Sequence, residues 1–150
     1  MRPVTWRWYT WEELSCDGLY DLLALRAAVF VVEQDCPYQD LDGQDRDARH
    51  LLGRSEDGTL VAYLRAFEPG GVYAEVTIGR VVASGARRGE RLGTRLMEEG
   101  IRQSQATWGP EPIKLSAQAH LERWYGSLGF VTCGEGYLED GIPHLPMRRP

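Results

Sequence analysis

A run of arginines and glycines follows an expected strand and opens an expected helix, a pattern suited to binding a diphosphate. The strand is expected at residues 76–83 and the helix after Gly89. A helix start presents backbone N–H groups that have no acceptor inside the helix, and its dipole favours an anion there. Arg87, Arg88 and Arg91 add guanidinium groups that can fork onto phosphate oxygens. The spacing is not that of a P-loop or of a dinucleotide-binding loop, so neither nucleotide class fits.

Aromatic residues and glycines at positions 124–130 form a second segment, which an intervening strand separates from the first. Its Tyr125 carries a phenolic hydroxyl that can donate a proton, although an aromatic residue on a helix face more often belongs to the core. Each segment alone is a weak signal. Their joint occurrence, in this order and on either side of a strand, is a stronger signal than either alone.

The two segments resemble the acyl-coenzyme A loop and the later tyrosine segment of the GCN5-related N-acetyltransferase (GNAT) family. In the loop, Arg88, Gly89, Leu92 and Gly93 stand on the family's usual positions. Arg91 departs from the pattern, because it occupies the slot of the central glycine. This side chain either crowds the pyrophosphate or turns outward and adds charge to it. The resemblance implies that acetyl-CoA is the co-substrate.

The resemblance also implies roles for individual residues. Tyr125 is expected to protonate the departing CoA thiolate, and the backbone of Val81 and Val82 is expected to contact the pantetheine arm. Gln118 stands where the family often has an asparagine beside that arm. The full set of residues expected at the cofactor is Val81, Val82, Arg87, Arg88, Gly89, Glu90, Arg91, Leu92, Gly93, Thr94, Gln118 and Trp124.

Residues 26–40 and 139–144 resemble the ElaA-type bacterial acetyltransferases, so the resemblance covers nearly the whole chain. It implies an α+β fold with a central, mostly antiparallel twisted sheet flanked by helices. The implied activity is transfer of an acetyl group to a primary amine by direct attack on the thioester. The alternative is a catalytically silent module that binds or senses acyl-CoA. The resemblance does not name the acceptor.

Attack by an amine requires a group that takes the amine's proton. Glu33 is the first candidate, because it follows the first helix on the side where the family's acceptor groove opens; the alternative is a solvated glutamate at a helix end. His120 and His144 also titrate near neutral pH, and each is expected to be structural.

Acidic residues gather between the first helix and the second strand. They form either a negative rim that attracts a cationic amine or a solvated loop. His50 with two of them suggests a metal site, but residues 40–45 lack the glycine position of an EF-hand, so no metal is expected. The acidic residues are Glu33, Asp35, Asp40, Asp42, Asp45 and Asp47.

The composition narrows the class of partner. A formal net charge of -5 argues against nucleic acid and favours a cationic acceptor. The N-terminus lacks an apolar secretory core, and no apolar run reaches the roughly 20 residues of a membrane span, so a cytoplasmic protein with no membrane partner is expected. Cys16, Cys36 and Cys133 have no paired spacing and are expected to be reduced thiols. A monomer or a homodimer is expected.

The apolar periodicity supplies the elements that must position these residues, in the order β-α-β-β-β-α-β-α-β-β. This order indicates a single α+β domain over residues 1–150. Gly79 is expected to mark a bulge inside its strand, and residues 39–49 are expected to form a long loop at the substrate site. The expected strands are 5–9, 51–54, 60–67, 76–83, 113–117, 131–133 and 142–147, and the expected helices lie within 19–30, 89–107 and 121–128.

Overall fold

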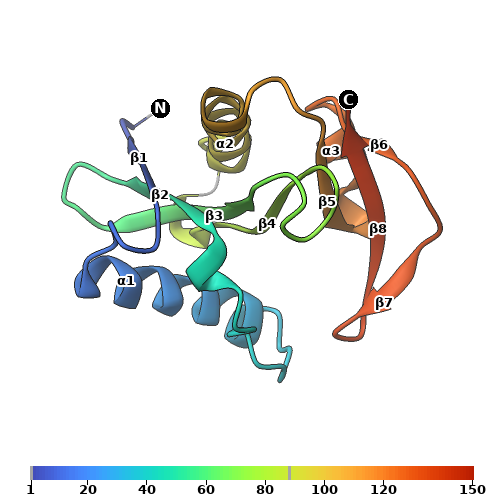
Figure 1. Ribbon diagram of the computed structural model, residues 1–150. Coiled ribbons are helices and arrows are strands. Elements are labelled where there is room, and N and C mark those ends of the chain that lie inside the picture. Colours follow the sequence, from blue (N-terminus) through green and yellow to red (C-terminus); the bar gives the residue numbers. More distant parts are fainter. Residues whose placement is uncertain (1, 88) are drawn as a thin grey trace.

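One mixed sheet runs through the molecule, with helices on both of its faces (Figure 1). A computed structural model describes residues 2–87 and 89–150. The described sheet has eight strands in the order β1-β2-β3-β4-β5-β8-β6, and β7 pairs with β8 beside this path. Neighbouring strands are antiparallel except for β4 and β5, which are parallel. The predicted α+β fold with a mostly antiparallel sheet is confirmed.

The strands are β1 (Thr5–Tyr9), β2 (Arg49–Arg54), β3 (Leu60–Phe67), β4 (Val76–Ala83), β5 (Ile113–Gln118), β6 (Val131–Thr132), β7 (Tyr137–Glu139) and β8 (Ile142–Arg149). The α-helices are α1 (Cys16–Arg26), α2 (Leu92–Trp108) and α3 (Glu122–Gly126). A π-helix, η1 (Ala27–Glu33), continues α1, and short 3-10 helices lie at η2 (Asp45–Asp47), η3 (Gly85–Arg87) and η4 (Ala119–Leu121).

The first helix differs from its prediction, because its α-helical part ends at Arg26 and the chain continues as η1. The start follows from local chemistry: the Ser15 hydroxyl accepts a hydrogen bond from the Gly18 N–H at 2.9 Å. In η1 the ring of each hydrogen bond widens by one residue, as in the bond from the Gln34 N–H to the Val29 carbonyl at 3.1 Å. Valines in η1 are β-branched and fit a tight α-helix less well than leucine, which favours this departure.

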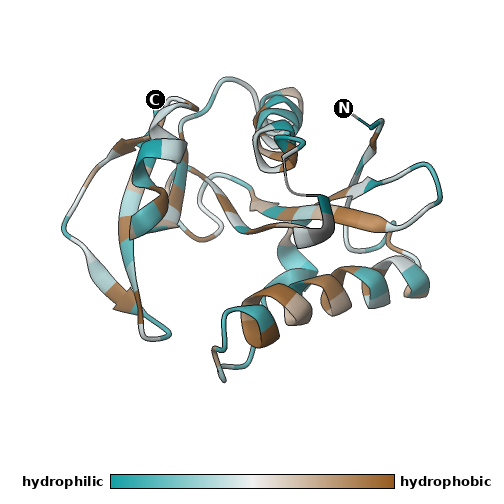
Figure 2. Ribbon diagram, turned by 180° about the vertical axis from the view of Figure 1, so that it is seen from behind, coloured by the Kyte–Doolittle hydropathy of each residue, from teal (hydrophilic) through white to brown (hydrophobic). Residues whose placement is uncertain are grey.

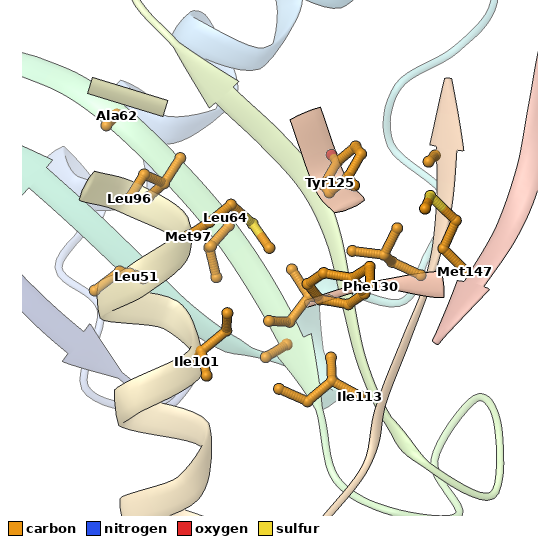
Figure 3. Close-up of a cluster of buried hydrophobic side chains, with 14 of the residues drawn as sticks. Leu51, Ala62, Leu64, Leu96, Met97, Ile101, Ile113, Tyr125, Phe130 and Met147 are labelled. Carbon is orange, nitrogen blue, oxygen red and sulfur yellow. The ribbon is translucent and has the colours of Figure 1, made fainter. Parts of the chain in front are cut away.

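Each strand in the middle of the sheet sends alternate side chains to opposite faces. Leu51 and Leu64 face α2 and join the larger core, whereas Leu52 and Tyr63 face α1 and join the smaller one. Figure 3 shows the larger core, with leucine, methionine and isoleucine side chains of α2 packed on the sheet beside Tyr125. Along α1, hydrophobic and hydrophilic residues alternate in bands (Figure 2).

Helix α2 approaches the sheet closely at a glycine. A Cβ added at Gly100 would lie 2.6 Å from Leu64 Cδ2, which is shorter than any normal contact. The absence of a side chain at this position therefore lets α2 rest on β3. This contact fixes the height of α2 above the sheet, and with it the place where the helix begins at the end of β4.

Candidate functional site

The site is built on a gap in the sheet between β4 and β5. These strands are paired only at Val76 with Ile113 and at Thr77 with Lys114, within the part of the chain that the structure describes. β5 pairs with β8 along its other edge, and beyond Thr77 no pairing of β4 with β5 is described, so the edge of β4 that faces β5 presents backbone N–H and C=O groups without a strand partner. An exposed edge of this kind can pair with an extended ligand.

A cavity of about 260 Å³ lies at this gap, and both faces of the sheet contribute to its wall. Leu121 and Tyr125 come from the face that carries α2 and α3, and Val29 and Phe30 come from η1 on the opposite face. The remaining wall residues are Val31, Gln34, Cys36, Tyr38, Gln39, Asp40, Ile78, Gly79, Arg80, Val81, Val82, Ala83, Leu115, Ser116, Gln118, His120, Glu139, Asp140, Ile142 and His144. Elements on both faces of the sheet therefore bound this cavity.

A bulge in β4 lies at the cavity, where Gly79 had suggested one. Arg65 of β3 is opposite Gly79, and Tyr63 is opposite Val82, so β4 has one residue more than β3 between these pairs. Arg80 inside the bulge has a φ of 50°, in the left-handed region that side chains seldom adopt. The surrounding structure must hold it there.

An ion-pair network beneath η1 holds this arginine. Arg80 Nε lies 2.8 Å from Asp40 Oδ1, and its Nη2 donates to the Asp40 backbone carbonyl at 2.8 Å. Arg26, which is fully buried, donates from Nε to Asp40 Oδ2 and from Nη1 to Asp45 Oδ1, both at 2.7 Å. Arg65 pairs with Asp42 and donates from Nη1 to Asp45 Oδ1 at 2.9 Å.

This network corrects one interpretation of the acidic loop. Asp40, Asp42 and Asp45 are neither a free negative rim nor a solvated loop, because three arginines from other elements neutralise them. Burial disfavours the charged form of Asp45, but hydrogen bonds and charge from Arg26 and Arg65 outweigh this effect and lower its pKa. Asp42 behaves in the same way, and its pKa also lies below the usual range.

His50 likewise has a structural role. Its Nε2 donates to the Asp45 backbone carbonyl at 2.8 Å, and its Nδ1 accepts from the Tyr63 hydroxyl at 2.6 Å. Burial lowers the pKa of this histidine, which keeps it neutral. No group of three histidine, cysteine or acidic side chains that could hold a metal ion was found among residues 2–87 and 89–150.

The start of α2 lies at the end of β4, beside the gap. The first helical hydrogen bond at this end joins the Arg95 N–H to the Arg91 carbonyl, so the N–H groups of Leu92, Gly93 and Thr94 precede it and are free of helical acceptors. Gly89 has a φ of 85° and Arg91 has a φ of 52°, both in the left-handed region. A glycine at position 91 would adopt this conformation without strain, which explains why glycine suits that slot.

The side chains of Arg87 and Glu90, in the loop before α2, pair with other side chains of the protein. Arg87 is buried and donates to both carboxylate oxygens of Glu90, at 2.8 and 3.0 Å, and Arg2 binds the same carboxylate. The Arg87 guanidinium and the Glu90 carboxylate thus bind each other within the loop, and their roles at the cofactor stay predictions. The hydrogen bonds from Arg87 and Arg2 lower the pKa of Glu90, which stays ionised. Arg88, predicted at the same site, lies outside the described residues.

Contacts within the protein also account for four further residues of the predicted set. Leu92 is buried in the larger core. Trp124 donates from Nε1 to Thr94 Oγ1 at 3.1 Å, and a Cβ at Gly93 would lie 3.3 Å from the tryptophan ring. The glycine therefore admits Trp124 between α2 and α3. At this end of α2 the backbone N–H groups, rather than these side chains, are available to an anion.

Tyr125 brings a phenol into the cavity from the apolar face. Its ring packs edge-on against Phe130, with 5.9 Å between ring centroids, and only 6% of the residue is exposed. Burial raises the pKa of Tyr125 to about 12, so the hydroxyl carries its proton at neutral pH. No hydrogen bond from this hydroxyl to another described residue was found, which leaves it available to a ligand.

Of the remaining predicted residues, three line the cavity and Glu33 does not. Val81, Val82 and Gln118 line the cavity, and Gln118 Nε2 donates to Gln34 Oε1 at 3.4 Å. Val82 also packs in the smaller core. Glu33, the last residue of η1, is exposed and is not among the residues that line the cavity.

Glu139 and His144 line the cavity, although the sequence had suggested only a structural role for the histidine. They lie on the β7–β8 hairpin, and β7 was not predicted. A signal for it was present, since Asp140-Gly141 is a dipeptide typical of a tight hairpin turn. Both residues of this turn have positive φ, as such turns require.

Comparison with known proteins agrees with this arrangement. The family described as "Acetyltransferase (GNAT) domain" matches residues 16–149. Protein ElaA of Escherichia coli strain K12 is 48% identical over 148 residues, which are 97% of this chain and 96% of that protein. The crystal structure of an acyl-CoA N-acyltransferase from Pseudomonas aeruginosa has a TM-score of 0.93 at 48% identity, covering 99% of this chain and 100% of that one.

The crystal structure of Escherichia coli ElaA has a TM-score of 0.91 at 47% identity, again covering 99% of this chain and 100% of that one. None of the helices described is both long and apolar enough to span a membrane. The split sheet, the helix start beside it and the buried tyrosine thus occur in a chain whose sequence and fold agree with one family over nearly its whole length. This chain belongs to the GNAT family of acyl-CoA N-acyltransferases and is a homologue of ElaA.

Proposed function

We propose that this protein transfers the acetyl group of acetyl-CoA to a primary amine by direct attack of the amine on the thioester. The observation that carries the proposal is the cavity at the gap between β4 and β5, with Tyr125 buried in its wall and β4 leading through η3 to the start of α2. In a cavity bounded by both faces of the sheet, the thioester and the amine can approach each other from opposite faces and react without a covalent enzyme intermediate.

The free groups of the gap fit the parts of acetyl-CoA. The N–H groups of Leu92, Gly93 and Thr94 are suited to the pyrophosphate, since they point out of a helix start. The unpaired edge of β4 at Val81 and Val82 is suited to the amides of the pantetheine arm. Arg88 remains a sequence-based prediction for the phosphate contact.

Tyr125 is the group that we assign to the leaving thiolate. As the amine nitrogen bonds to the carbonyl carbon, the carbon–sulfur bond breaks and the sulfur takes the Tyr125 proton. A pKa raised to about 12 keeps the phenol protonated at neutral pH, so its hydroxyl can donate to the sulfur as negative charge develops there. The apolar packing around the ring also orients the hydroxyl at no further entropic cost.

The test is incubation with acetyl-CoA and a panel of primary amines, following both free CoA thiol and acetylated amine. An enzyme releases the two products in equal amounts. A silent acyl-CoA-binding module would be stabilised against heat by acetyl-CoA but would release no thiol beyond the background. That second outcome, over a panel that spans small polyamines, lysine side chains and peptide N-termini, would contradict the proposal.

A further inference from the structure

We infer that His144 takes the proton of the acceptor amine through its Nε2 atom, and that Glu139 is a positioning residue for this imidazole. The inference rests on the proposed N-acetyltransferase function and names the base of that reaction. It replaces Glu33 in this role, because Glu33 is exposed outside the cavity lining whereas His144 is part of it. Three observations carry it: the place of His144 in the sheet, the hydrogen bond at its Nδ1, and the charges around it.

His144 is held in place by strands on both sides. On β8 it is paired with Gln118 of β5 and with Tyr137 of β7. The Tyr137 ring stacks on the imidazole, with 6.2 Å between centroids and 20° between planes. Only 8% of the histidine side chain is exposed, although it lines the cavity. A base in this position is held by its neighbours and is largely shielded from bulk water.

The hydrogen bond at Nδ1 decides which nitrogen can act. His144 Nδ1 lies 2.7 Å from the backbone carbonyl of Ile142, and a carbonyl can only accept. Nδ1 therefore carries the hydrogen of the neutral imidazole, and Nε2 carries the lone pair. The nearest carboxylate oxygen, Glu139 Oε2, is 3.4 Å from Nε2, longer than a normal hydrogen bond.

Glu139 becomes effective when Nε2 is protonated, because the pair then has opposite charges. About half of the Glu139 side chain is exposed, so the attraction is moderate. Glu139 is therefore placed to pair with the imidazolium once Nε2 has taken a proton from the amine. A general base that must release its proton after each turnover needs a moderate attraction of this kind.

Other charges in the cavity leave a negative excess near the histidine. Asp40 and Arg80 lie in the same wall and neutralise each other, whereas Glu139 and Asp140 have no arginine or lysine partner among the described residues. The titratable residues that line the cavity or stack on the imidazole are Cys36, Tyr38, Asp40, Arg80, His120, Tyr125, Tyr137, Glu139 and Asp140. The excess favours a cationic amine at the β7–β8 side of the gap.

The protons balance in this scheme. An ammonium acceptor gives one proton to His144 Nε2, which later releases it to water. The free amine then bonds to the carbonyl carbon, the carbon–sulfur bond breaks, and Tyr125 protonates the sulfur. The second proton lost from nitrogen replaces the proton that Tyr125 gave away. The products are the acetylated amine, the CoA thiol and one proton.

The experiment compares His144→Gln with the wild type in kcat/KM for the amine across pH, with acetyl-CoA affinity measured by calorimetry. Glutamine keeps a donor that can reach the Ile142 carbonyl, but it cannot take a proton. We expect kcat/KM to fall about 10²-fold or more at neutral pH, with acetyl-CoA affinity retained. The deficit should shrink at alkaline pH, where the amine is already deprotonated.

Glu139→Gln is a second variant that does not disturb the core, because this side chain is half exposed. We expect a decrease of about three- to tenfold, with the acid limb of the pH profile moved to lower pH. The matched control is Glu99→Gln, whose carboxylate pairs with Arg102 on α2 and lies outside the cavity; it should leave the profile unchanged.

Two outcomes would overturn the inference and are distinguishable. If the wild type turns over but His144→Gln has the same pH profile, the base is another group and the proposed function stands. If the wild type binds acetyl-CoA and acetylates no amine, the proposed function fails and the role of His144 fails with it. An unshifted acid limb in Glu139→Gln would remove the positioning role alone.

Discussion

The two faces of the sheet are held by different forces, and each force suits the reacting group on that face. The face under α2 and α3 has the larger apolar core, and Tyr125 is buried within it. The face under α1 and η1 has a core of only a few residues, and the arginine–aspartate network lies beside it. An apolar surrounding keeps a phenol protonated, whereas charged side chains, among them Glu139 and Asp140, line the cavity near His144. In the proposed reaction, this difference separates the proton donor, Tyr125, from the proton acceptor, His144.

The largest effect on activity should come from a substitution on the face under α2 and α3. Tyr125→Phe removes the hydroxyl and keeps the ring that packs against Phe130. We expect kcat to fall by roughly 10² to 10⁴, with little change in acetyl-CoA affinity or in the melting temperature. Steady-state kinetics with calorimetry measures both. Turnover at the wild-type rate would return this tyrosine to the core and remove the donor from the comparison.

The stability of the protein should be more sensitive to the loss of a single charge on the face under α1 and η1, which has the arginine–aspartate network, than on the face under α2 and α3. Arg26 is fully buried and pairs with both Asp40 and Asp45, so Arg26→Met leaves two carboxylates short of a partner. We expect a loss of about 3 to 5 kcal/mol in the free energy of unfolding, measured with urea. Arg54→Met is the matched control, because its pair with Asp21 is largely exposed and should contribute less than about 1 kcal/mol. Equal losses in the two variants would contradict the role of the network.

Low pH should reduce the stability that the arginine–aspartate network contributes, but not the stability that the larger apolar core contributes. The pKa values of Asp42 and Asp45 are lowered in the folded chain, so below about pH 4 the unfolded chain binds more protons and the folded state loses stability. Above about pH 4 this contribution is fully present. Met97→Ala, in the larger core, should cost about 2 to 5 kcal/mol at pH 7 and at pH 4 alike.

Asp42→Asn tests the assignment of this acid sensitivity, because it removes one titrating group from the network. Its unfolding free energy should fall less steeply with decreasing pH than that of the wild type. Asp47→Asn is the control, since Asp47 is exposed and has no ion pair in the described part of the chain. A slope that is the same in all three proteins would place the acid sensitivity elsewhere.

The smallest effect concerns the charge that remains at the cavity. For a cationic acceptor, kcat/KM should fall about two- to threefold as salt rises through the physiological range, because screening shortens the reach of Glu139 and Asp140. Asp140→Asn should reduce this dependence, and Asp47→Asn should not. A neutral amine should show no salt dependence with any of the proteins.

Many of the helices and strands could be predicted from the sequence. Strands β1, β3 and β4 have the bounds that residue type and turn residues indicated, because each is a run rich in β-branched, aromatic or other apolar residues between clear breaks. Strand β7 was missed, since its three residues are exposed and too short to show a period. The change from α1 to η1 was also missed, because apolar spacing does not distinguish an α-helix from a π-helix over seven residues.

Features of the site that depend on residues close in sequence were predictable. Features that depend on ion pairs or strand pairings between residues far apart in sequence were not. The left-handed slot at Arg91 and the burial of Tyr125 follow from neighbouring residues. The partners of Asp42 lie on β3 and β4, far along the chain, so the sequence showed an acidic run where the fold has neutral pairs. For the same reason, the position of His144 beside the gap appeared only when β5, β7 and β8 were paired.

The most direct test of the central claim, that both substrates meet in one cavity and react without an acyl-enzyme, is the initial-rate pattern with acetyl-CoA and amine varied together. Double-reciprocal lines that intersect are predicted, because the acetyl group moves only when both substrates are bound. Parallel lines would contradict the claim, since they indicate that CoA leaves before the amine binds. The acetyl group would then rest on the enzyme, and Cys36 in the cavity wall would be the first place to look for it.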